Sequence, residues 1–220
     1  MIRRHATMLA IVLAGSLASG GEFPGLTAPA WAGPPTDAVR KSVDEVIHIL
    51  EDPAWKKPEK KEDRRKLLEQ TIAARFNFTE MAKRSLAAEW AKRTPEEQNE
   101  FAANFQTLLA NTYIGRIEAY SGEKVQYIKE LSDGEYAETY THVDTGKDVI
   151  DINYRLQKNS DDWRVYDVVV EGTSLVQNYR EQFKRILHKN SFAELSRQLR
   201  EKSSNIKAPV PDGSGAAKGK

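Results

Sequence analysis

The chain contains no cysteine, and this absence removes several classes of function at once. Disulfide bonds, a cysteine-linked lipid anchor, a thiol nucleophile and metal sites built from thiolates are all excluded. A charge excess of either sign is also missing, since the formal net charge is +1 over 220 residues. A nucleic-acid-binding protein is expected to carry a strong basic excess, so the charge balance argues against that class.

Long hydrophobic runs are also scarce. The uncharged apolar run at residues 8–18 is too short to span a bilayer. It follows a basic start and precedes the small-residue site Ala30-Trp31-Ala32. This order is typical of a cleavable secretory signal peptide, which we place at residues 1–32 and which predicts a periplasmic location. A retained signal anchor is the alternative, and the short run disfavours it.

Residues for catalysis or metal binding are few and scattered. Beyond the signal segment, His48, His142 and His188 lie far apart, and no HExxH, GxSxG or phosphate-loop motif occurs. The acidic stretch at residues 159–162 lacks the twelve-residue pattern of a calcium loop, so a hairpin turn explains it more simply. We therefore predict no catalytic residue, no metal site and no enzyme activity.

The clearest pattern is a strand that runs through a glycine corner into an amphipathic helix, over residues 163–187. Three consecutive valines at 168–170 leave both strand faces apolar, so we predict that this end of the strand is covered on both sides. Gly172 permits the corner, and Ser174 with Gln177 fits a capping box. By strict alternation, one face of the strand holds Trp163, Val165, Asp167 and Val169, and the other holds Arg164, Tyr166, Val168 and Val170.

This alternation puts Tyr166 and Asp167 on opposite faces of the strand. They are therefore a poor acid–base pair, although cone-shaped folds of helices and sheet can host such pairs. We expect Asp167 instead to pair with an arginine or to cap a helix.

Helices are expected over residues 36–122. Thr36 is interpreted as the N-cap of the first helix, and apolar residues at helical spacing mark a third helix over 81–90. The sequence Thr94-Pro95-Glu96-Glu97 is a strong start signal for a long helix that continues to about residue 121. Its apolar stripe indicates either a packed core or the lining of a groove, and periodicity alone favours a core.

After residue 124 the apolar period changes to two, which predicts an antiparallel sheet. Its third strand alternates Ile150, Ile152, Tyr154 and Leu156 with polar residues, so one face of the sheet must be covered by helices. Helices are expected again over about 174–202, and a small, polar tail at 203–220 is expected to be disordered. The four predicted strands lie near 124–131, 135–143, 147–157 and 163–171.

The run at residues 166–183, YDVVVEGTSLVQNYREQF, closely resembles the MlaC family, also called the toluene-tolerance or ABC-transporter auxiliary family. The resemblance extends over about residues 36–202. It also covers, in order along the chain, Phe76, Phe78, Met81, Leu86, Trp90, Phe101, Phe105, Leu108, Leu109, Tyr113, Tyr120, Gly122, Tyr154, Arg155, Leu156 and Trp163.

The resemblance implies an α+β fold with an NTF2-like antiparallel sheet packed against long helices, together with a small helical subdomain. One lipid-binding domain is then expected over residues 33–202, with the helical part at about 36–122, the sheet at about 124–171 and the C-terminal helices at about 174–202. The family encloses phospholipid acyl chains in an apolar pocket and leaves the headgroups largely in solvent. The residues expected to line the pocket are Leu109, Tyr113, Ile117, Tyr154, Leu156, Val168, Val170, Leu175, Val176 and Tyr179.

The resemblance also implies a role in outer-membrane lipid asymmetry. Such carriers shuttle phospholipid between an outer-membrane Mla lipoprotein complex and the substrate-binding ring of an inner-membrane Mla ABC transporter. No cofactor is expected apart from the lipid cargo, no nucleic acid is expected as a partner, and the chain is expected to be a monomer. The alternatives are a carrier of hopanoid or another lipid, a lipid-free periplasmic interaction scaffold, and a periplasmic enzyme, which the absent acid–base pair disfavours.

Overall fold

The computed structural model describes residues 33–205, with side chains as far as residue 203. The predicted signal segment and residues 206–220 lie outside this part. The predicted α+β fold class is confirmed. The helices are α1 (Pro34–Glu51), α2 (Lys61–Arg75), α3 (Phe78–Leu86), α4 (Pro95–Glu118), α5 (Leu175–Lys189) and α6 (Phe192–Asn205), with short 3-10 helices η1 (Pro58–Lys60) and η2 (Ala87–Lys92). The strands are β1 (Lys124–Asp133), β2 (Tyr136–Asp144), β3 (Val149–Asn159), β4 (Asp162–Val170) and β5 (Thr173–Ser174).

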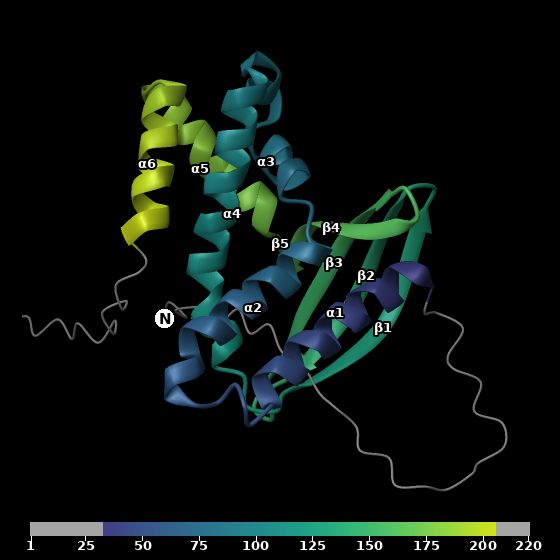
Figure 1. The fold of residues 1–220 in the computed structure, drawn as a ribbon. Helices are drawn as coiled ribbons and strands as arrows, with labels where there is room; N and C mark the ends of the chain where they lie inside the picture. Colours follow the sequence, from purple (N-terminus) through teal and green to yellow (C-terminus); the bar gives the residue numbers. More distant parts are fainter. Residues whose placement is uncertain (1–32, 206–220) are drawn as a thin grey trace, which may run out of the picture.

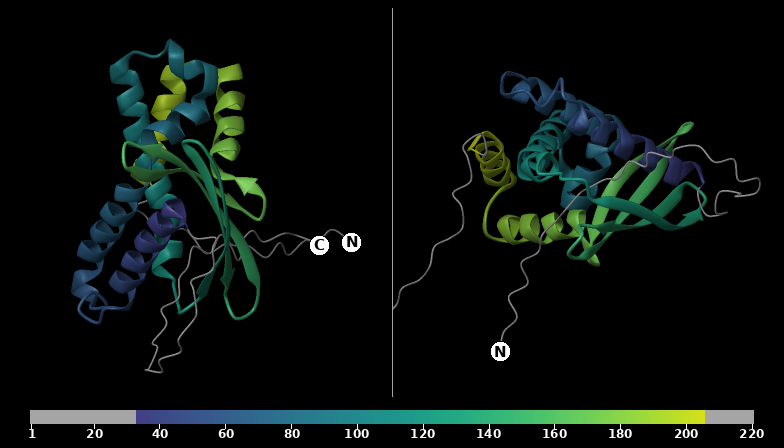
Figure 2. Two further views of the ribbon diagram at one scale, coloured as in Figure 1. Left: turned by 90° about the vertical axis from the view of Figure 1, so that its right-hand side faces the viewer. Right: turned by 90° about the horizontal axis from the view of Figure 1, so that it is seen from below.

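The strands form one antiparallel sheet in the order β1-β2-β3-β4-β5, and α1 crosses one face of it with α2 beside it (Figure 1). The helices α3, α4, α5 and α6 gather at one end of the sheet, and Figure 2 shows them as a group apart from α1 and α2. The first four strands match the predicted ones to within three residues, because short turns and a clear period of two mark them. β5 has two residues, too few for a periodic pattern to reveal.

A β-bulge in β4 changes the predicted faces of that strand. Asp167 is paired with Arg155 and Val165 with the next residue, Leu156, so Tyr166 is the extra residue. Strict alternation across the whole strand is therefore wrong. Val165 shares the covered face of the sheet with Val168 and Val170, because a bulge shifts the alternation by one residue. The three valines at 168–170 are all buried, which confirms that this end of the strand is covered on both sides.

A carboxylate from β1 holds the N-terminus of α1. Glu130 accepts hydrogen bonds from the backbone N–H groups of Gly33 (3.2 Å) and Thr36 (2.9 Å) and from the Thr36 hydroxyl (2.6 Å). The prediction that Thr36 caps the helix is wrong, since α1 already begins at Pro34 and Thr36 lies in its first turn. A charged acceptor from another element replaces the local side-chain cap and also suits the helix dipole.

The predicted start of α4 is confirmed. Thr94 and Glu97 form a full capping box, and the helix ends at Glu118, three residues before the predicted end. The third helix is shorter than predicted because Ala87 has a φ of 53°, which stops α3 and leaves a 3-10 helix in place of its last turn. At 24 residues, α4 is about 36 Å long at 1.5 Å per residue and reaches both groups of helices.

The buried apolar residues form two clusters. The sheet core combines the covered face of the sheet with α1, α2 and the last turns of α4, and the helix core combines α3, α5, α6 and the first part of α4. α4 gives Phe101, Phe105, Leu108 and Leu109 to the helix core and Ile114 and Ile117 to the sheet core. The long helix therefore connects two cores that do not merge.

Candidate functional site

A cavity of about 390 Å³ lies where the two cores meet. Its walls come from α2, α3, α4, β4 and the β5–α5 corner, so segments far apart in the sequence enclose it. Most of its lining is apolar, and a volume of this size is typical of a ligand pocket. The apolar lining residues are Ile72, Phe76, Phe78, Met81, Leu109, Ala110, Tyr113, Ile114, Ile117, Val168, Val170 and Leu175.

The structure brings six of the ten predicted pocket residues around this cavity. They are Leu109, Tyr113, Ile117, Val168, Val170 and Leu175. Tyr154 and Leu156 lie elsewhere, in the sheet core, where both are buried. Val176 and Tyr179 belong to the helix core, and the Tyr179 ring meets the Phe105 ring edge-on at 5.1 Å.

The apolar lining residues absent from the predicted list are Ala110 and Ile114 on α4 and four residues in or beside α2 and α3. Ile72 lies in the last turn of α2 and Phe76 directly follows that helix, whereas Phe78 and Met81 lie in the first turn of α3. Phe76 packs against both cores, and its ring stacks on that of Phe78 at 5.8 Å. The sequence signal was the Phe-x-Phe pair between two helices, because two large apolar side chains at such a junction must find cover.

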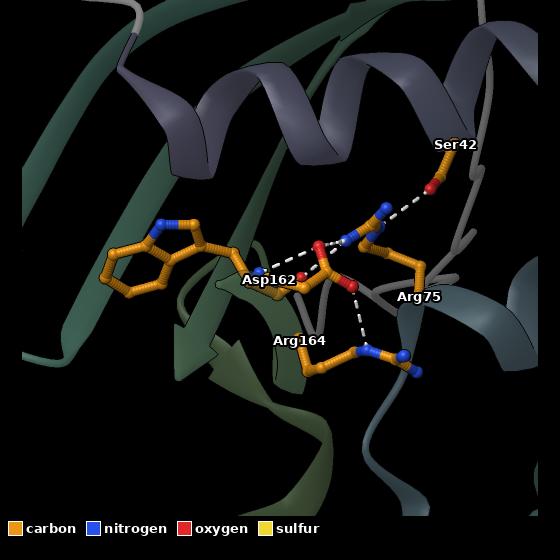
Figure 3. Close-up of polar contacts among 5 residues, drawn as sticks. Ser42, Arg75, Asp162 and Arg164 are labelled. Carbon is orange, nitrogen blue, oxygen red and sulfur yellow. Dashed lines mark hydrogen bonds and ion pairs between the residues drawn. The ribbon is translucent and has the colours of Figure 1, made fainter. Parts of the chain in front are cut away.

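An arginine cluster fixes the end of α2 against the sheet (Figure 3). Arg75 donates to Ser42 Oγ of α1 at 2.9 Å, to Asp162 Oδ1 of β4 at 2.6 Å and to the Trp163 carbonyl at 2.6 Å. Arg164 donates to the other Asp162 oxygen at 3.0 Å. Asp162 thus serves as an ion-pair acceptor in a two-residue hairpin, which agrees with the predicted turn at 159–162. Because Phe76 follows Arg75, this cluster also positions one wall of the cavity.

The ion pairs predict a pH-dependent contribution of Asp162 to stability. Burial opposes ionisation of the carboxyl, but the hydrogen bond and charge of Arg75, with smaller help from Trp163 N–H and Arg164, outweigh it and lower the pKa of Asp162. Because the pKa of Asp162 is lower in the folded state, its carboxylate stabilises the fold at pH values above its unfolded-state pKa of about 3.9. This contribution is lost as the pH falls through the lower pKa of the folded state.

We expect the difference in unfolding free energy between the wild type and Asp162→Asn to be constant from pH 7 to about 5 and to shrink below about pH 4. Denaturant unfolding at a series of pH values measures it. Asp161→Asn, in the same turn, is the control and should show no such trend. A difference that grew in acid would contradict the assigned ion pair.

Asp167 fixes the opposite wall, at the start of α5. This buried carboxylate accepts hydrogen bonds from the Ser174 hydroxyl (2.6 Å) and the Val176 N–H (3.0 Å), and it pairs with Arg155 Nη1 at 3.3 Å. Ser174 in turn caps α5 by accepting from the Gln177 N–H at 3.0 Å. The prediction that Asp167 pairs with an arginine or caps a helix is confirmed in both respects. Its oxygens are therefore occupied by structural contacts.

The polar groups near the cavity do not form a catalytic arrangement in the described part of the chain. Burial raises the pKa of Tyr113 above its ordinary value, so its hydroxyl stays neutral at physiological pH. Tyr166 lies against Arg84, whose guanidinium is 4.0 Å from the ring centroid. The histidines are absent from the cavity lining, and His142 faces Asp151 at 3.2 Å on the open face of the sheet.

Residues 33–205 contain no group of three histidine or acidic side chains placed to hold a metal ion. No helix among them combines the length and the apolar character that crossing a bilayer requires. The fold and the cavity together define an α+β protein that has room for an apolar ligand between helices and sheet.

Comparison with known proteins identifies the family. Residues 40–201 match the family model described as MlaC protein, so the chain belongs to the MlaC family. The predicted membership is confirmed. This family consists of non-enzymatic lipid carriers, which agrees with the prediction that the chain is not an enzyme.

Among solved structures, the chain is similar to a phospholipid-binding protein from Ralstonia solanacearum, solved in complex with a phospholipid. The sequence identity is 24%, the TM-score is 0.70, and the match covers 80% of this chain and 100% of that one. The likeness establishes a shared fold. No curated protein matches the chain.

Proposed function

We propose that the protein is a periplasmic carrier that holds phospholipid acyl chains in the cavity and shuttles them between membranes. The observation that carries this proposal is the apolar cavity between the two cores, because an ordinary packed domain leaves few voids of that size. Membership of the MlaC family and the shared fold of a protein solved with bound phospholipid support it.

The energetics of acyl-chain burial are compatible with such a role. Two sixteen-carbon chains contain on the order of 30 methylenes, whose transfer out of water at about 0.8 kcal/mol each is worth roughly 24 kcal/mol. A bilayer already provides this gain, so a carrier needs a comparably dry site. The twelve apolar residues around the cavity supply one, and the predicted lining residues Leu109, Tyr113, Ile117, Val168, Val170 and Leu175 are proposed to contact the chains.

The other four predicted pocket residues have a different role in this proposal, because they do not line the cavity. Tyr154 and Leu156 lie in the sheet core, and Val176 and Tyr179 lie in the helix core. They are proposed to support the walls of the cavity and to contact a chain when the cavity widens. The donor and acceptor of the lipid are proposed to be the outer-membrane Mla lipoprotein complex and the substrate-binding ring of the inner-membrane Mla ABC transporter. The predicted signal segment at 1–32, which lies outside the described residues, supports the proposed periplasmic location.

The decisive experiment is native mass spectrometry of the protein purified from the periplasm, followed by organic extraction and lipid identification. We expect about one diacyl phospholipid per monomer. Hopanoid in its place would keep the carrier role and change the cargo. A protein without lipid that also takes none from liposomes would contradict the proposal and leave the lipid-free scaffold as the better interpretation.

A further inference from the structure

The carboxylate that holds the start of α1 has no cation beside it. Glu130 on β1 is half-buried. It accepts hydrogen bonds from the Gly33 N–H, from the N–H and hydroxyl of Thr36, and from the Ser132 hydroxyl at 3.0 Å. All of these donors are uncharged, and within residues 33–203 Glu130 takes part in no ion pair. A carboxylate that is partly removed from water is costly unless a cation balances its charge.

The basic residues nearest to this contact along the chain face other groups. Lys129 directly precedes Glu130, and its ammonium lies 4.2 Å from the centroid of the Tyr140 ring. Arg40 lies in the second turn of α1, and its guanidinium is 4.2 Å from the centroid of the Tyr127 ring. The side chains of the described residues therefore leave the charge of Glu130 unbalanced.

The backbone nitrogen of Gly33 is the neighbour of this carboxylate that can become a cation. It lies 3.2 Å from Glu130 Oε2. The absence of a side chain at Gly33 permits this approach, because a Cβ atom there would lie 2.5 Å from Glu130 Oε1 and would displace the carboxylate. The φ of Gly33 is −94°, which suits any residue, so space rather than backbone conformation favours glycine at this position.

Gly33 is also the residue that follows the predicted cleavage site Ala30-Trp31-Ala32. Hydrolysis of the bond between Ala32 and Gly33 consumes one water molecule and leaves a carboxyl group on Ala32 and an amine on Gly33. The amine takes up the proton that the carboxyl group releases, since the ordinary pKa of an α-amine is about 8. We propose that removal of the signal segment at this bond creates an ion pair between the Gly33 ammonium and Glu130.

This inference rests on the predicted signal segment and is independent of the cargo. A positive charge at the start of a helix is unfavourable in the field of the helix dipole, so the ammonium stabilises the fold only with the carboxylate in front of it. A hydrogen bond between two charged groups is stronger than one from a neutral N–H. Processing thus completes the attachment of α1 to β1, and α1 is one of the helices that cover the sheet core (Figure 1).

The first test is the identity of the N-terminus. N-terminal sequencing and the intact mass of the protein purified from the periplasm should both give Gly33 as the first residue. A protein that begins at any other residue would overturn the inference, because the Gly33 nitrogen would then be absent or would remain a neutral peptide N–H.

The second test is a double-mutant cycle between the α-amine and Glu130. The chain that begins at Gly33 is acetylated at its α-amine in denaturant at about pH 6.5, where lysine amines stay protonated, and is then refolded. Denaturant unfolding at pH 7 should show that acetylation lowers the folding equilibrium constant about fivefold. In the Glu130→Gln chain, acetylation should leave this constant unchanged or raise it, since the ammonium there faces only the helix dipole.

Glu135→Gln, an exposed change in the β1–β2 hairpin, is the matched control and should show the same fivefold loss on acetylation as the wild type. Equal effects of acetylation in the wild type and in Glu130→Gln would overturn the ion pair. The lipid content of the same samples tests the carrier function separately. Lipid-loaded protein without the ion pair would leave the carrier function intact, and a chain with the ion pair that takes up no lipid would contradict the carrier function alone.

Discussion

Val168→Trp is expected to expel lipid from the cavity while the chain still folds. Val168 is buried on β4 and lines the cavity, so an indole there extends into space that a ligand would occupy. If it takes the room of two or three methylenes at about 0.8 kcal/mol each, lipid retention weakens roughly 15- to 60-fold. Native mass spectrometry of the purified variant reports the lipid content, and far-ultraviolet circular dichroism reports folding.

The control for this substitution is Val149→Trp, on the same sheet. Val149 is 58% exposed and is absent from the cavity lining, so its lipid content should equal that of the wild type. Ala110→Trp blocks the cavity from the α4 side and serves if Val168→Trp does not fold. Wild-type lipid content in a folded Val168→Trp protein would show that the cavity is not where the acyl chains bind.

Asp167→Ala is expected to be the most destabilising single substitution among the polar residues discussed. It removes the acceptor for Ser174 Oγ and the Val176 N–H and leaves Arg155 without its buried partner. Loss of a buried charged acceptor and a helix cap together costs about 3 kcal/mol. For a domain of this size, that corresponds to a fall in Tm of roughly 6–12 °C.

Denaturant unfolding measures this loss, and Asp167→Asn and Asp151→Ala provide the comparison. Asparagine keeps an oxygen for the Val176 N–H, so Asp167→Asn should lose about half as much stability. Asp151 is an exposed aspartate on β3 whose side chain pairs with His142, and its removal should change stability by less than about 0.5 kcal/mol. Equal effects of Asp167→Ala and Asp151→Ala would contradict the anchoring role of Asp167.

Local patterns made most of the secondary structure predictable. The capping box at Thr94 and the turns between strands each involve only three or four consecutive residues, so they can be recognised directly in the sequence. The roles that were missed involve residues far apart in the chain. Glu130 caps α1 from a position 94 residues beyond Thr36, and no spacing rule connects the two. The predicted start of the tail at residue 203 falls within α6, which continues to Asn205 because helix ends carry weak signals.

The cavity could be predicted in part. The apolar stripe of α4 and the valines of β4 were identifiable, since periodicity states which face of an element is buried. Periodicity does not indicate whether a buried face packs against another element or borders a cavity. Tyr154, Leu156 and Val168 all belong to the sheet core, yet of these three only Val168 also lines the cavity. Ile72 and Met81 carry the same apolar pattern as core residues, and three-dimensional packing alone places them beside the cavity.

The division into two cores has a consequence for how the protein unfolds. With the cavity empty, the sheet core and the helix core are connected through α4 and through other residues such as Phe76, which packs against both cores. A molecule that fills the cavity contacts both cores at once and joins them into one cooperative unit, and it favours the native state by mass action. If the chain carries lipid as proposed, the loaded form is expected to unfold more cooperatively than the empty form. The empty form is then expected to be the one more exposed to partial opening and proteolysis.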